Sequence, residues 1–544
     1  MQRLAYLTLA TALLVAAPAR SATQGDAQAA VDRLLADIVA AEDALLDRLG
    51  DYRPFMETYL QTVDENATFS ESVDDHYLIG KVHVTPVEVE WTALSASRAF
   101  FKERNSFFGD KFLTLIGKKA LRPESFAGMI VPDPRGVSRD RYEFTFVRRE
   151  FLGEVRTLVF NIHPVRGDNG FIGRIWVEDR SSHIVRFNGS HAAGRRGGKT
   201  LHFDSWRTEV EPGFWAPSYV YIQDGDAEGG LGARFKAQAR LWNYSPSATT
   251  ALDELTSILV ESEWEVHEQD PAEHVTPLES RRRWRKEAQN NVLQRLERAG
   301  LLAPAGPVDK VLGQVVQNLI ATNGLDLDVE CRVLLTTPLE TFSIGQAIVI
   351  SRGLIDVLPD EAALAAALSD ELAHIVLGHR METLYGFSDY TVFEDIEILD
   401  RMRLRRSPEE IAAASVKAEE LLESSPYADK LGAAGLFLKA LRKHAPRLPN
   451  LIEGNLGNEL ALGSELQRLT GLTEGAPELE EENLDQIAAL PLGSRIRLDP
   501  WTNAISLLPP QPAALRTSQD KLPFEVTPFM PHLERIRADA PTAP

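Results

Sequence analysis

Cysteine is almost absent from this chain of 544 residues, in which Cys331 is the one cysteine, so no intramolecular disulfide can form. Basic residues are outnumbered: 58 Lys and Arg stand against 79 Asp and Glu, for a formal net charge of −21 at pH 7. This balance argues against nucleic acid as a partner, because binding it requires a basic face that displaces counterions. The sequence also lacks a Gly-rich phosphate loop, a nucleophile elbow and a cysteine pair, which argues against those classes of site.

What the chain does contain is typical of a folded protein, with 44% hydrophobic and 25% charged residues. Its length predicts more than one domain. The N-terminus has a basic start at 1–3, an apolar run over 4–17 and the small-residue pattern Ala-Pro-Ala at 17–19, with a second cleavage option after Ala22. We therefore expect residues 1–22 to be a signal peptide, the alternative being an uncleaved anchor. No later run reaches the roughly 18 apolar residues of a spanning helix, so we expect a periplasmic or secreted protein.

The hydrophobic pattern changes along the chain. Apolar residues recur at helical spacing within 25–65, whereas 77–244 alternates apolar and polar residues in segments rich in β-branched and aromatic side chains, as an antiparallel meander does. The predicted organisation is a helical lead-in and antiparallel β domain over 25–260, a charged helical linker over 277–300, a second domain over 301–506, and an extended, partly disordered Pro-rich tail over 507–544.

Within the β domain, the stretch Gly173-Arg-Ile-Trp-Val-Glu-Asp179, followed by Ile184-Val-Arg-Phe187, resembles the repeating strand of outer-membrane lipoprotein carriers of the LolA/LolB type. The resemblance covers residues 65–244. It implies a curved sheet whose greasy concave face contacts acyl chains of lipoproteins or an extended peptide. The alternative is a β-sheet domain that binds no ligand.

The segment 361–380 carries the residues with the most chemical content. Ala and Leu predominate in it, and Asp360 and Glu361 suit the N-terminal end of a helix. In an HExxH helix, two histidines four residues apart bind zinc and the Glu beside the first one acts on the metal-bound water. Here the sequence reads Asp370-Glu371-Leu-Ala-His374, so an aspartate stands where the first histidine belongs.

The surroundings of this helix strengthen the pattern. Upstream are Arg332-Val-Leu-Leu335, the segment 340–355 ending in Arg-Gly-Leu-Ile, and an acidic turn before the helix with its ELAHxxLGH sequence. This order resembles the M-48 family of zinc metallopeptidases over roughly 200 residues. The resemblance implies a gluzincin fold with zinc as cofactor, Glu371 as the catalytic general base, and Asp370 with His374 as metal ligands. It also implies an edge strand over 342–350, including Phe342 and Gly345, that binds the substrate backbone by strand addition.

The later parts of the family pattern are altered. The family takes its third ligand from a Glu in E-x-x-A-D, and the matching place reads Ser425-Pro-Tyr-Ala-Asp429. Serine followed by proline is typical of a helix start, so Ser425 is interpreted as an N-cap. Asp429 could replace the missing ligand, being better placed for that than Glu423. His379 is interpreted as a helix-end histidine. Arg495 lies in the late segment Leu490–Ile496, and by resemblance it matches an arginine near the family's active site. The alternative is a surface arginine in a salt bridge.

These observations predict an α+β chain, with a mainly antiparallel β N-terminal domain followed by a gluzincin-like metallopeptidase domain. Two functions stay open. One is an exported zinc metalloendopeptidase that acts on envelope proteins or peptides with two of its three ligand positions altered. The other is an inactive pseudopeptidase that serves as a periplasmic chaperone, scaffold or lipoprotein- or peptide-binding protein.

Overall fold

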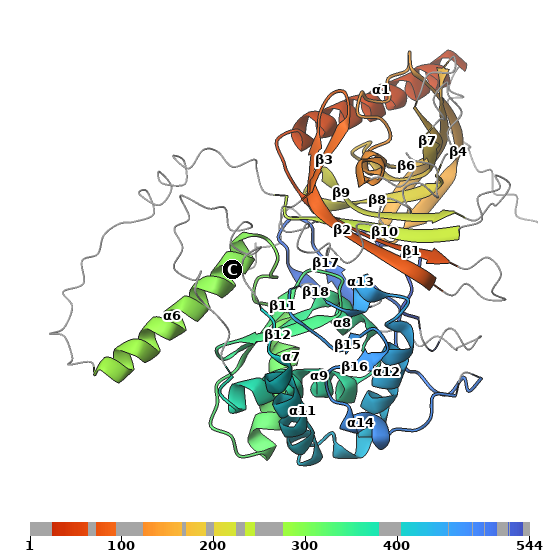
Figure 1. Cartoon of the computed structure of the whole chain (residues 1–544). Coiled ribbons are helices and arrows are strands. Elements are labelled where there is room, and N and C mark those ends of the chain that lie inside the picture. Colours follow the sequence, from red (N-terminus) through yellow and green to blue (C-terminus); the bar gives the residue numbers. More distant parts are fainter. Residues whose placement is uncertain are drawn as a thin grey trace, which may run out of the picture.

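A computed structural model of the chain describes residues 24–63, 72–93, 123–165, 170–191, 201–224, 234–244, 276–379, 404–454, 456–480, 482–493, 495–508, 521 and 523–536. The predicted signal peptide lies outside them. Figure 1 shows a large curved sheet crossed by a long helix, and a second, mixed part beside the strands β1, β2 and β10.

The first part follows the alternating pattern of the sequence. Its elements are α1 (Gln24–Leu49), β1 (Phe55–Val63), β2 (Ser72–Val84), β3 (Val89–Ala93), α4 (Pro123–Ala127), η2 (Gly128–Ile130), β4 (Tyr142–Leu152), β5 (Val155–Pro164), β6 (Phe171–Glu178), β7 (Ile184–His191), β8 (Phe203–Glu211), β9 (Phe214–Asp224) and β10 (Arg234–Trp242). The ten strands form one sheet in the order β3-β2-β1-β10-β9-β8-β7-β6-β5-β4, and every neighbouring pair is antiparallel. The predicted antiparallel sheet is confirmed.

The predicted helix over 25–65 is wrong beyond Leu49. Residues Phe55–Val63 are β1, in the middle of the sheet between β2 and β10. Successive side chains of a strand point to opposite faces. Accordingly, Phe55 and Tyr59 belong to the core shared with the second part, whereas Met56 and Leu60 belong to the core under α1. A strand buried on both faces is apolar at successive positions and resembles a helix in its pattern.

The second part mixes helices with short strands, as expected for an α+β fold. Its elements are α6 (Pro277–Arg298), α7 (Pro307–Thr322), β11 (Glu330–Leu334), β12 (Glu340–Ile344), β13 (Ala347–Ser351), α8 (Arg352–Val357), α9 (Glu361–Val376), α11 (Pro408–Glu423), η5 (Ala428–Lys430), α12 (Leu431–His444), α13 (Pro449–Ile452), β14 (Asn458–Glu459), β15 (Ala461–Leu462), β16 (Glu465–Leu466), α14 (Gly471–Glu474), β17 (Ile496–Leu498) and β18 (Ile505–Leu507). Four strands form a sheet in the order β11-β13-β12-β14. Helix α9 packs against β12 and β13 and against α7, α11 and α12.

The two parts share one apolar core and are joined by buried polar contacts. Glu57 of β1 accepts hydrogen bonds from the Thr337 N–H at 2.6 Å and from Arg352 Nη2 at 2.6 Å. Asp75 of β2 accepts hydrogen bonds from the backbone N–H groups of Asn450 at 3.0 Å and Leu451 at 2.8 Å. Because buried polar groups are costly unless they are hydrogen-bonded, these contacts fix how the sheet sits on the second part.

The described part of the predicted tail packs on the body. Residues 523–536 contain neither helix nor named strand, and Phe524, Val526 and Leu533 are buried in the shared core. The Gln61 side chain of β1 hydrogen-bonds the Phe524 carbonyl at 2.7 Å and the Val526 N–H at 2.8 Å. Among the described helices, none is long and apolar enough to cross a membrane.

Candidate active site

Helix α9 carries the residues that the sequence pattern selected. It begins at Asp360, whose side chain accepts a hydrogen bond from the Ala363 N–H at 2.8 Å. The Ala- and Leu-rich sequence favours the helix. It ends where Gly378 takes φ +69° and the His379 N–H bonds back to the His374 carbonyl at 3.0 Å. The helix is thereby fixed at both ends inside the fold.

Asp370, Glu371 and His374 lie together, as their spacing predicts. All three are fully buried. Asp370 Oδ2 lies 3.9 Å from His374 Nε2, one helical turn away. Thr341 of β12 donates its hydroxyl to Glu371 Oε1 at 2.8 Å. Helix α9 therefore presents two adjacent carboxyl groups and an imidazole to the neighbouring sheet.

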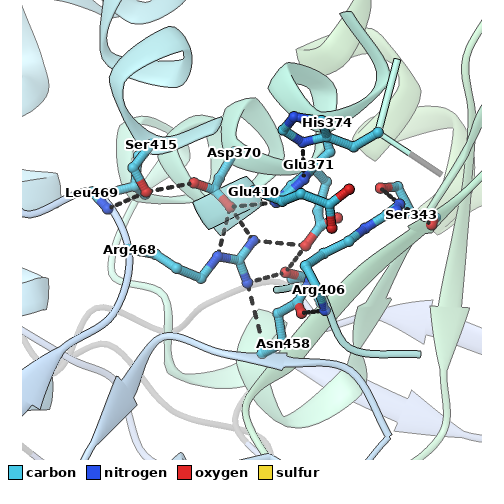
Figure 2. A network of polar contacts seen from close by, with 12 residues as sticks. Ser343, Asp370, Glu371, His374, Arg406, Glu410, Ser415, Asn458, Arg468 and Leu469 are labelled. Carbon is cyan, nitrogen blue, oxygen red and sulfur yellow. Dashed lines mark hydrogen bonds and ion pairs between the residues drawn. The ribbon is translucent and has the colours of Figure 1, made fainter. Parts of the chain in front are cut away.

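A guanidinium group occupies the space between the two carboxyl groups. Arg468, which follows β16, is fully buried, and Figure 2 shows its side chain reaching between Asp370 and Glu371. Its Nε lies 2.6 Å from Asp370 Oδ2, and its Nη2 lies 2.5 Å from that oxygen and 2.6 Å from Glu371 Oε1. Its Nη1 donates to Thr341 Oγ1 at 2.7 Å and to the Asn458 carbonyl at 3.3 Å. Every nitrogen of the guanidinium thus has a partner at this position.

The electrostatics of the cluster follow from burial and from this arginine. Burial raises the pKa of Asp370 above its ordinary value, and Arg468 offsets only part of the effect. Burial also opposes ionisation of Glu371, but there Arg468 and other nearby groups outweigh it and hold the pKa below its ordinary value. The two carboxyl groups in turn raise the pKa of Arg468 despite its burial. The guanidinium therefore stays charged and Glu371 stays ionised at neutral pH.

His374 is held as a neutral imidazole. Burial lowers its pKa to about 4. Its Nδ1 lies 2.9 Å from Nδ1 of His379, so one ring donates to the other. His379 is at the helix end, as predicted, but its side chain turns back onto the cluster. Among the described residues, no hydrogen-bond partner reaches the buried Nε2 of His374.

Part of the strand region that would bind a substrate backbone is already paired. Glu340 and Thr341 of β12 pair with β14, just before the predicted edge strand at 342–350, and β13 lies between β11 and β12. Further along β12, Arg406 Nη2 donates to the Ser343 carbonyl at 3.0 Å. Phe342 is fully buried, and Gly345 forms the turn after β12 with φ +63°. Substrate binding by these two residues stays a prediction, as does strand addition along 342–344, whereas β14 already pairs with Glu340 and Thr341.

The other predicted residues lie apart from the cluster. Ser425 caps a turn, donating to the Leu422 carbonyl at 2.6 Å and accepting from the Tyr427 N–H at 3.1 Å. The sequence predicts a helix that starts at Pro426, but no helix starts there. The next helical turn is η5, in which Asp429 is exposed. Glu423 is exposed at the end of α11.

Arg495 lies at the opposite end of α9 from the cluster. Its backbone N–H donates to Asp356 Oδ1 at 3.0 Å and its Nη2 donates to the Pro359 carbonyl at 2.8 Å, just before the helix begins. The arginine that contacts the carboxyl groups of the cluster is Arg468 instead.

Part of the region around α9 matches a known protein family. Residues 309–417 match the model of Peptidase family M48. No curated protein matches the chain. Among solved structures, the chain is similar to a LolA superfamily protein from Nitrosomonas europaea, with 10% identity, a TM-score of 0.23, and coverage of 41% of this chain and 96% of that one. The superfamily is the one that the strand pattern suggested, but a TM-score this low carries no argument about fold or ligand.

The M48 match supports a peptidase-like domain around α9. It spans α7 to most of α11 and therefore includes Asp370, Glu371 and His374. It ends before Ser425, where the family's third ligand is missing, and before Arg468. Residues 301–506 contain this match, which covers 309–417, and are called the M48-like part for that reason alone.

The residues of the cluster do not fit a zinc ion. Catalytic zinc sites as a rule use three protein ligands and leave a fourth position open to water. In the part of the chain that the structure describes, no three His, Cys, Asp or Glu side chains are grouped so as to hold a metal ion. Asp370 and Glu371 are engaged by Arg468, and a divalent ion at His374 Nε2 would meet the positive charges of Arg468 and Arg406, both close enough to lower the pKa of that imidazole.

Sequence reasoning missed Arg468 and Thr341, which complete the cluster. Neither belongs to a motif, and Arg468 is separated by 98 positions in sequence from Asp370. One signal was available: two adjacent acidic residues on a helix of otherwise apolar character require a buried cation or a metal ion. Once the first histidine of the pattern is lost, an arginine becomes a candidate for that cation.

Proposed function

We propose that this chain is a non-hydrolytic relative of the M48 peptidases, exported to the cell envelope, in which the M48-like part is a scaffold and not a protease. The observation that supports this most directly is the Arg468 guanidinium between Asp370 and Glu371. The sequence also left open a zinc endopeptidase. That function would require Arg468 to leave a position in which each guanidinium nitrogen has a hydrogen-bond partner.

The general base of the peptidase reaction is not available in this arrangement. Such a base must take a proton from a water molecule that lies beside it. Glu371 is fully buried, accepts hydrogen bonds from Thr341 and Arg468, and has a pKa held below its ordinary value. A carboxylate stabilised in this way is a weak base, and its Oε1 is occupied.

The polar contacts between the two parts support a scaffold role. The M48-like part provides Arg352, Thr337 and α13 as partners for Glu57 and Asp75 of the sheet. The sheet is thus built onto the peptidase-like fold and is not loosely tethered to it. We propose envelope proteins, peptides or lipoproteins as partners, bound at a surface other than the paired Glu340–Thr341 stretch of β12.

A hydrolysis assay tests the proposal. The mature chain is incubated with zinc and an unfolded protein such as casein, beside a Glu371→Gln variant prepared in parallel. We expect the two proteins to give the same background of cleavage, because Glu371 does not act as a base. Cleavage by the wild-type chain that disappears in Glu371→Gln would contradict the proposal.

A further inference from the structure

The two halves of helix α6 have different surroundings. In its C-terminal half, Val292, Leu293 and Leu296 are buried in the core that the two parts of the molecule share. In its N-terminal half, the side chains described within 278–287 are exposed, except for the half-buried Arg285. Figure 1 shows this end of the helix extending away from both parts. One half therefore anchors the helix, and the other half projects from the body.

The projecting half carries a dense group of cations. Five positive charges lie within six residues: Arg281, Arg282, Arg283, Arg285 and Lys286. Together with the acidic Glu279 and Glu287, they give residues 278–287 a net charge of +3. The whole chain carries −21, so this half has the opposite sign to the molecule that bears it. We call 278–287 the basic end of α6.

We infer that the basic end of α6 binds the anionic headgroups of a phospholipid bilayer. Clusters of four or more Lys and Arg on an exposed helix are attracted to an anionic lipid surface, and each cation close to the surface strengthens binding roughly fivefold. The inference goes beyond the proposed function and shares with it only the cell envelope as location.

Two large apolar side chains among these cations favour lipid over an acidic protein as the partner. Trp284 is 64% exposed and Leu278 is 60% exposed. Tryptophan is enriched at membrane–water interfaces, where its amphipathic ring lies at the level of the headgroups. A partner that offers charge alone would leave both side chains in water, whereas the boundary between headgroups and acyl chains accepts them together with the cations.

The length of the projection separates the cations from the acidic body. An α-helix rises about 1.5 Å per residue, so residues 278–287 extend roughly 15 Å. The Debye length at physiological ionic strength is about 8 Å. The tip of the helix is thus about two Debye lengths from the folded body, whose negative charge would otherwise repel an anionic surface.

The basic end is helical without any partner. The Thr276 side chain caps the helix by accepting a hydrogen bond from the Glu279 N–H at 3.3 Å, and Pro277 lies in the first turn, where proline is favoured. The packed half of the helix sets the direction of the projecting half. Because the backbone is already ordered, binding does not have to offset the loss of its conformational freedom.

Sedimentation with lipid vesicles tests the inference. The mature chain is mixed with vesicles of phosphatidylglycerol and phosphatidylcholine in equal parts, or of phosphatidylcholine alone. The α6 variant removes four exposed cations: Arg281→Gln/Arg282→Gln/Arg283→Gln/Lys286→Gln. The matched control removes four exposed cations on and beside α12: Lys430→Gln/Arg442→Gln/Lys443→Gln/Arg447→Gln. Both variants change the net charge equally, and glutamine is nearly as favourable in a helix as arginine or lysine.

We expect the wild-type chain and the α12 control to bind the anionic vesicles equally well and to leave phosphatidylcholine vesicles unbound. The α6 variant should bind the anionic vesicles at least about a hundredfold more weakly, because it lacks four of the five cations. Trp284→Ala keeps every cation and should weaken binding about tenfold, since the ring is no longer buried at the interface.

Three results would overturn the inference. The first is a wild-type chain that does not sediment with the anionic vesicles, and the second is an equal loss of binding in the α6 variant and the α12 control. The third concerns the eight Asp and Glu within 253–273, which lie outside the described residues. Vesicle binding that appears only after these eight are replaced by amides would show that they already occupy the cations.

Discussion

Replacing Arg468 by alanine removes the positive charge from the middle of the M48-like part. The guanidinium contacts Asp370, Glu371 and Thr341 at 2.7 Å or less, and all four residues are fully buried. The substitution therefore leaves two carboxyl groups inside the protein with no opposite charge between them, and it also opens a cavity.

The expected loss of stability follows from these contacts. Removing one partner of a buried ion pair costs about 3–5 kcal/mol, since the remaining charge stays buried and uncompensated. We therefore expect Arg468→Ala to lower the free energy of unfolding by about 3–5 kcal/mol in buffer containing a chelator. Replacing the whole group with residues of similar shape, as in Asp370→Asn/Glu371→Gln/Arg468→Met, should recover most of that loss.

Urea unfolding followed by circular dichroism measures both variants against the wild-type chain. If Arg468 compensates the two buried carboxylates, the loss is large in the single variant and small in the charge-free triple variant. A change in Arg468→Ala of less than about 0.5 kcal/mol, the usual effect of a surface substitution, would refute the reasoning that the arginine compensates two buried charges.

Two further predictions concern the contacts between the sheet and the M48-like part. Burial raises the pKa of Asp75 from 3.8 to about 7, so its contribution to stability is present below about pH 4 and is lost as the pH rises through about 7. Between about pH 4 and pH 7, urea titrations should show the stability of the wild type falling by about 3 kcal/mol relative to Asp75→Asn, and parallel pH profiles would show that Asp75 titrates normally. Glu57→Ala leaves Arg352 buried without its closest carboxylate and should lower the unfolding free energy by about 3 kcal/mol, whereas an unchanged urea midpoint would mean that this ion pair does not stabilise the fold.

The fold could be predicted from the sequence where apolar and polar residues alternate, as over 142–146, or where a short apolar run rich in β-branched and aromatic residues is bounded by turn residues, as over 155–162. It could not be predicted at β1, because Phe55–Val63 is buried on both faces and carries apolar residues at successive positions. The docking of 523–536 onto the sheet also escaped prediction, since it depends on a partner, Gln61, that is distant in sequence.

The candidate site, like the fold, could be predicted from the sequence only in part. Asp370, Glu371 and His374 come together because helical spacing is a local property that a sequence shows directly. Arg468 and β14 reach the cluster through tertiary packing, which no local pattern encodes. The family resemblance pointed to Arg495 as the arginine near the site, whereas Arg495 holds the turn before α9.

The metal content of the wild-type chain tests the central claim most directly. The mature protein is purified from a zinc-supplemented culture without chelators, and zinc is measured by elemental analysis beside a His374→Ala control. Because Arg468 already compensates Asp370 and Glu371, we predict zinc far below one atom per chain and equal in both proteins. Near-stoichiometric zinc in the wild type that is lost in His374→Ala would contradict the account.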